Sequence, residues 1–105
     1  MLNQIKIRKS EIEKFKHICK GETDTSDEEI CYKITRNFNL GKVIKTLGRD
    51  SYIVKFGTLC MLYRDGEITL IYRDFKRSTK VNVYEKYKYD YIHKGCEYAN
   101  RKYSA

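Results

Sequence analysis

The chain has 105 residues and a formal net charge of +8 at pH 7, with 41% hydrophobic and 34% charged residues. A chain of this length has room for one modest core, and its lack of proline argues against a fibrous or low-complexity protein. We therefore expect a single folded domain over residues 1–105, and the positive charge favours a polyanionic partner such as RNA, DNA or an acidic protein surface.

The first predicted element is a short helix from about Ser10 to Cys19. Ile12 and Phe15 have helical spacing, and Ser10 with Glu13 has the spacing of a capping box. Lysines are frequent in this segment, and they form either a solvated helix face or a binding face.

The strongest helix start signal in the sequence follows Ser26. Ser26 and Glu29 repeat the capping spacing, and the acidic residues that crowd this segment suit the positive end of a helix dipole. Ile30 and Ile34 begin an apolar stripe, and the helix is expected to end near residues 39–41. A helix start explains the acidic cluster without a bound ion, so we expect no metal here.

After this second helix the hydrophobic period becomes alternating, which predicts strands. The candidate strands are residues 42–47, 51–56, 58–64 and 67–73. Asp65 and Gly66 favour a two-residue hairpin, because both central positions of that turn need positive φ. We expect an antiparallel meander with one face covered by helices and one wetter face, and with Arg64, Tyr72 and Arg73 towards the wetter end.

The last third of the chain holds seven of the ten tyrosines together with nine Lys and Arg residues. Four of these tyrosines have helical spacing, and three alternate as on a strand. The helical set is Tyr84, Tyr87, Tyr91 and Tyr98, and the alternating set is Tyr87, Tyr89 and Tyr91. We favour a helix that begins near Val83. The predicted fold class is α+β, with two N-terminal helices, an antiparallel three- to four-stranded meander and a C-terminal helix.

This basic, tyrosine-rich segment has the parts of a nucleic-acid contact surface. Phenol rings offer faces on which bases stack, and Lys and Arg side chains neutralise phosphates. The candidate contact residues are Arg73, Lys76, Arg77, Lys80, Tyr84, Lys86, Tyr87 and Lys88. Some of these rings are also candidates for the core of a small domain.

Four segments follow one another in a familiar order: Ser26–Ile30, Gly41–Ile44, Tyr52–Lys55 and Asp65–Arg73. Together with the first helix they resemble the small ribonuclease-toxin superfamily that includes RelE and BrnT, especially its short relatives on phages and plasmids. Relatives of this type commonly have a His-Ala dipeptide in the first helix and an Arg about a turn later. Here Ser10 and Lys14 occupy those places.

Three functional hypotheses follow. The favoured one is a small mobile-element or phage-type protein that binds nucleic acid or a host nucleic-acid-handling complex, for example as an inhibitor of the anti-CRISPR kind. The alternative implied by the resemblance is an RNA-cleaving toxin that needs no metal, with Arg64, Tyr72 and Arg73 lining the phosphate and His93 as acid or base. The third is a protein-interaction module or homodimer anchored by tyrosines.

The four cysteines form no Cys-x-x-Cys pair, and Cys60 lies in an apolar run where a free thiol behaves as a small hydrophobe. A zinc site from His17, Cys19, His93 and Cys96 would lack common ligand spacing, so we expect no metal and no cofactor. No apolar run approaches the roughly 20 residues of a membrane helix. We expect a cytoplasmic protein that does not contact a membrane.

Overall fold

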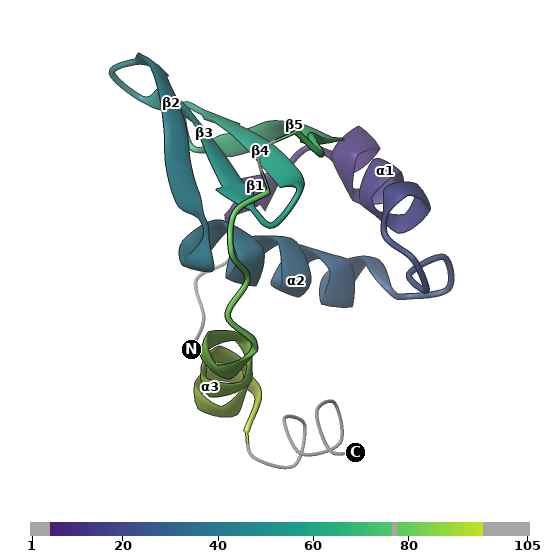
Figure 1. Ribbon diagram of the computed structural model, residues 1–105. Coiled ribbons are helices and arrows are strands. Elements are labelled where there is room, and N and C mark those ends of the chain that lie inside the picture. The colour runs from purple at the N-terminus through teal and green to yellow at the C-terminus, as the bar shows by residue number, and fades with distance from the viewer. Residues whose placement is uncertain (1–4, 77, 96–105) are drawn as a thin grey trace.

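The computed structural model describes residues 5–76 and 78–95 (Figure 1). Its elements are β1 (Lys6–Ile7), α1 (Lys9–Ile18), α2 (Asp27–Leu40), β2 (Lys42–Gly48), β3 (Ser51–Phe56), β4 (Leu59–Arg64), β5 (Glu67–Arg73) and α3 (Val83–Lys94). This order confirms the α+β class, the two N-terminal helices, the meander and the C-terminal helix. The sequence did not predict the two-residue strand β1.

The sheet has five strands in the order β1-β5-β4-β3-β2. Strands β2 to β5 form the antiparallel meander, and β1 adds a parallel strand at the edge beside β5. The hairpin between β4 and β5 turns at Asp65 and Gly66, whose φ angles of 51° and 89° are both positive. This confirms the predicted two-residue turn.

Helices α1 and α2 cover one face of the sheet, and α3 lies on the far side of α2 (Figure 1). The core between these layers is built from both helices and from strands β3, β4 and β5. Its buried members are Ile12, Phe15, Ile30, Ile34, Val54, Leu59, Met61, Ile68 and Ile71. The other sheet face is not simply wetter, as the sequence had suggested, because Lys55 and Cys60 are buried on it.

The two N-terminal helices begin differently. Ser26 caps α2 as predicted, because its Oγ accepts a hydrogen bond from the backbone N–H of Glu29 at 3.2 Å. The predicted capping box in α1 was wrong: the N-cap is Arg8, and Ser10 lies inside the helix and donates to the carboxylate of Glu11. The buried Glu11 Oε1 also accepts from the backbone N–H of Ile71 at 2.8 Å, which ties α1 to β5.

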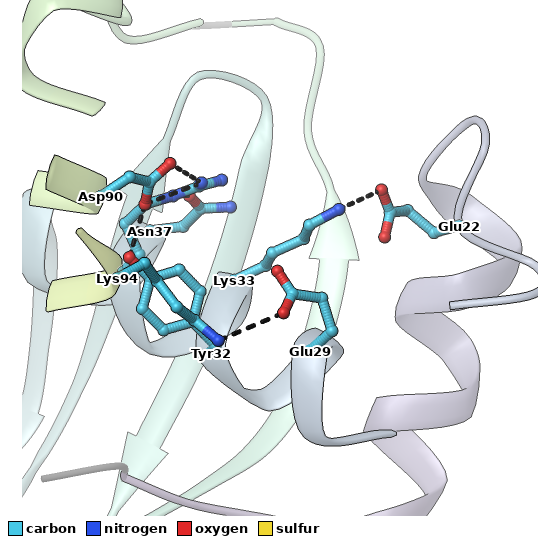
Figure 2. Close-up of polar contacts among 8 residues, drawn as sticks. Glu22, Glu29, Tyr32, Lys33, Asn37, Asp90 and Lys94 are labelled. Atoms are coloured by element: carbon cyan, nitrogen blue, oxygen red, sulfur yellow. Dashed lines mark hydrogen bonds and ion pairs between the residues drawn. The ribbon is translucent and has the colours of Figure 1, made fainter. Parts of the chain in front are cut away.

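Helix α3 is attached to α2 by a buried polar cluster (Figure 2). The fully buried Asp90 accepts a hydrogen bond from the Tyr32 hydroxyl at 2.5 Å and pairs with Arg36 Nη1 at 3.0 Å. Near the end of α3, Lys94 lies 3.3 Å from Glu29 of α2. Burial and the hydrogen bond to Asp90 raise the pKa of Tyr32, so its hydroxyl stays a donor at neutral pH. These contacts leave the tyrosine-rich side of α3 facing outward.

Candidate nucleic-acid interface

The connection from β5 to α3 is described at residues 74–76 and 78–82, and these residues are fixed beside the turn between β3 and β4. We call this connection the strap. The Asp74 N–H donates to the Thr58 carbonyl at 2.8 Å, and the Thr79 N–H donates to the Gly57 carbonyl at 2.9 Å. The Gly57 N–H in turn donates to Thr79 Oγ1 at 2.7 Å. The strap is therefore held at two points. Lys76, between these points, and Lys80, directly after the second, are thereby brought to the sheet.

Two adjoining hollows form between the strap and strands β2 and β3, and together we call them the basic hollow. The first, of about 700 Å³, is lined by Lys42, Val43, Ile44, Lys55, Asp74, Lys76 and Thr79. The second, of about 450 Å³, is lined by Leu40, Gly41, Lys42, Lys55, Phe56, Ser78, Thr79 and Lys80. Four lysines thus surround one region, with Asp74 as the single acid among these lining residues.

Lys55 is the inner wall of the basic hollow. Its side chain is 2% exposed, and its Nζ lies 3.3 Å from Asp74 Oδ2 in an ion pair that lacks hydrogen-bond geometry. No described residue forms a hydrogen bond with this ammonium group. The backbone N–H of Lys76 and the Lys55 ammonium lower the pKa of Asp74, so its carboxylate is ionised at neutral pH.

The basic hollow continues towards α3. A third hollow, lined by Leu40, Glu85, Lys88, Tyr89 and Ile92, shares Leu40 with it. A fourth, of about 560 Å³, is lined by Tyr84, Glu85, Tyr87, Lys88 and Tyr91 and shares two residues with the third. Shared lining residues make these hollows neighbours, and we call the whole path the lysine-tyrosine track. Figure 1 shows the course of the strap itself, which runs from the sheet to α3.

Five of the predicted contact residues line this track: Lys76, Lys80, Tyr84, Tyr87 and Lys88. Lys86 lies on α3, half-buried, and lines none of the four hollows. Arg77 lies outside the described residues. The sequence did not single out Lys42 and Lys55, because only the pairing of β2 with β3 places them beside the strap.

Arg73 is engaged in holding the fold. Its Nη1 donates to Thr58 Oγ1 at 2.7 Å, and its Nη2 donates to the Ile18 carbonyl at 3.2 Å. The half-buried guanidinium therefore caps the C-terminal end of α1 and lies on the helix-covered side. Its expected place at the wetter end of the sheet was wrong, because the register puts Arg73 opposite Leu59, a buried core residue.

The four residues of the nuclease hypothesis are not gathered in one place. Arg64 is exposed at the hairpin, whereas Arg73 pairs five residues further back along β4, a distance of about 17 Å at 3.3 Å per residue. Tyr72 points to the opposite sheet face from Arg73 and lies opposite Cys60. His93 lies on α3, with its ring 4.2 Å from that of Tyr89.

The remaining candidates from the sequence are the cysteines and the residue types that bind metals. Cys19, Cys31 and Cys60 are free thiols, and Cys60 is buried as predicted. Among residues 5–76 and 78–95, no three His, Cys, Asp or Glu side chains are grouped as metal ligands would be. Cys96 lies outside this part. None of the described helices has the length and apolar character that a bilayer crossing requires.

Comparison with protein families, with curated proteins and with solved structures finds no significant match. The resemblance to the RelE and BrnT superfamily therefore stays a prediction.

Proposed function

We propose that this protein binds single-stranded nucleic acid along the lysine-tyrosine track. The observation that carries the proposal is the continuity of the track, which joins four lysines of the basic hollow to four tyrosines of α3 through shared lining residues. A single strand needs both groups, because cations neutralise its phosphates and aromatic faces stack on its bases.

Three lysines of the basic hollow leave positive charge unmatched, because no ion pair within the described part of the chain involves Lys42, Lys76 or Lys80. Some lysines elsewhere are matched by acids: Lys16 Nζ lies 2.6 Å from Asp27, and Lys33 Nζ lies 2.6 Å from Glu22. Others, such as Lys6 and Lys20, form no ion pair within the described residues but line none of the four hollows. Unmatched cations along one path create a positive field that attracts phosphates.

The placement of the tyrosines also supports it. Tyr84 is 85% exposed and Tyr91 is 50% exposed, so neither ring serves the core. Helix α3 reaches α2 through Asp90 instead, and its aromatic side faces outward. Exposed rings beside lysines suit stacking on bases, which contributes about 1–3 kcal/mol per base.

The test is a binding titration of fluorescent 20-nucleotide single-stranded RNA and DNA against the protein at several salt concentrations. We expect affinity to fall about tenfold or more over a fourfold rise in salt, as for two or three phosphate contacts. The variant Lys42→Ala/Lys80→Ala should bind much more weakly. A matched control, Lys6→Ala/Lys20→Ala, removes equal charge from exposed positions away from the track and should change binding little.

The outcomes separate the hypotheses. Equal losses of affinity in the track variant and in the control would contradict binding along the track. If the protein binds neither RNA nor DNA, a protein partner is favoured. The same RNA is examined for integrity on a denaturing gel. Cleaved RNA would favour the ribonuclease alternative, and a mass that rises with protein concentration would favour the homodimer.

A further inference from the structure

Lys55 has an ammonium group that the described protein atoms leave without a hydrogen bond. The side chain is almost fully buried, and its one ionic partner, Asp74, meets it at 3.3 Å without hydrogen-bond geometry. An ammonium group has three N–H donors, and burying them unsatisfied is unfavourable. Lys55 lines both parts of the basic hollow, and its Nζ is closed to solvent in the free protein. A shift of this side chain towards the hollow would bring its donors to the acceptor atoms of a ligand bound there.

The charge of the basic hollow suits a doubly negative ligand. Lys42 and Lys76 line the same cavity as Lys55, and Lys80 lines the adjoining one. Asp74 neutralises only one of these four lysines, and its carboxylate is already used by Lys55 and by the backbone N–H of Lys76. A bound group with about two negative charges and several acceptor oxygens would complete the site.

We propose that the basic hollow binds a phosphate monoester, and, resting on the proposed function, that this is the terminal phosphate of the bound strand. A phosphodiester within a strand carries one negative charge and a nucleoside on each side. A monoester carries about −1.5 to −2 at pH 7 and three free oxygens, so it can enter the hollow and reach the buried Lys55. The strand then leaves past Leu40 towards the tyrosines of α3.

The experiment compares one single-stranded oligonucleotide in three forms: with a 5′-phosphate, with a 3′-phosphate, and with hydroxyls at both ends. We expect one phosphorylated form to bind about tenfold more tightly than the unphosphorylated form, the factor for one added charge-assisted contact. Lys55→Met keeps a long unbranched side chain but removes its charge, and it should abolish this preference while leaving salt-dependent binding of the unphosphorylated strand. Lys42→Ala, at an exposed position, serves as a second variant and should reduce the preference.

Tyr84→Ala is the matched control, because it should weaken all three forms by the same factor. Equal binding of the three forms by the wild-type protein would overturn the terminal-phosphate proposal even if the strand binds. Inorganic phosphate and adenosine monophosphate are titrated in parallel by NMR. Shifts at Lys55 and Lys76 with these small ligands, but no oligonucleotide binding, would keep the monoester site and overturn the nucleic-acid function.

Discussion

Lys42 and Lys55 are direct cross-strand partners on β2 and β3. Like charges in this position repel, and a cross-strand pair contributes roughly 0.2–1 kcal/mol in either direction. Here Lys55 is also buried, with Asp74 as its ionic partner at 3.3 Å. The fold therefore keeps two cations together at a place where neutral side chains would be more stable, and binding an anion is the use that we propose for them.

The first prediction follows from this conflict. Lys55→Met should leave the free protein as stable as the wild type or more stable, because replacing a buried charge by an apolar group of similar volume is often neutral or stabilising by about 1–4 kcal/mol. Thermal unfolding measures this. Adding phosphate should raise the Tm of the wild type but not that of the variant. A strong loss of stability in Lys55→Met would show that the Lys55–Asp74 pair holds the strap in place.

The second prediction concerns the anchor of α3. Asp90→Asn should destabilise the protein by about 3–5 kcal/mol, because Arg36 would be left buried without its ionic partner. Urea unfolding gives the stability, and hydrogen exchange across residues 83–94 should rise first. Glu85→Gln, on the exposed side of the same helix, is the control and should have little effect. Unchanged hydrogen-exchange protection of α3 in Asp90→Asn would contradict the conclusion that Asp90 attaches α3 to α2.

The third prediction separates Arg73 from the track. Arg73→Ala should cost about 1.5–3 kcal/mol of stability, since its guanidinium donates to Thr58 and to the Ile18 carbonyl. Its nucleic-acid affinity, measured where the variant is folded, should stay close to that of the wild type. Lys80→Ala should show the reverse, with normal stability and weaker binding. If the folded Arg73→Ala variant lost nucleic-acid binding, Arg73 would be a contact residue of the interface after all.

The fourth prediction is that Glu11 contributes to the pH dependence of the free energy of unfolding. Although burial opposes it, hydrogen bonds from Lys14, the Ile71 N–H and Ser10 hold the pKa of Glu11 below its ordinary value. A lowered pKa in the folded state adds stability above the ordinary carboxyl pKa of about 4.3, and this stability is lost as the pH falls through the folded value. Urea unfolding from pH 6 to pH 3 should show a shallower decline for Glu11→Gln than for the wild type. Parallel declines would contradict the assignment.

Local signals predicted much of the fold. The Ser26 cap, the Asp65-Gly66 turn and the start of α3 near Val83 depend on a few neighbouring residues, and all three are found in the structure. The prediction that α1 begins at Ser10 was wrong because the backbone of Arg8 is bonded to β5: its N–H donates to the Ile68 carbonyl at 3.0 Å, and the helix begins directly after it. A capping pattern in the local sequence cannot indicate this contact, because the two residues are far apart in the chain.

The candidate site was predicted only in part for a similar reason. The lysines and tyrosines of the strap and α3 lie close together along the chain, so the sequence alone showed that they cluster. Lys42 and Lys55 join them only through strand register. From the sequence, Arg36 is one of the residues in the last part of α2. Its partner Asp90 is 54 residues away, and no local pattern indicates that pairing.

The most direct test of the central claim is NMR mapping of the wild-type protein with a short single-stranded oligonucleotide at low salt. We predict shifts and line broadening along the track, at Lys42, Lys76, Thr79, Tyr84 and Tyr91, with little change on the exposed side of α1. Changes centred on α1, or spread evenly over the basic surface, would contradict binding along the lysine-tyrosine track.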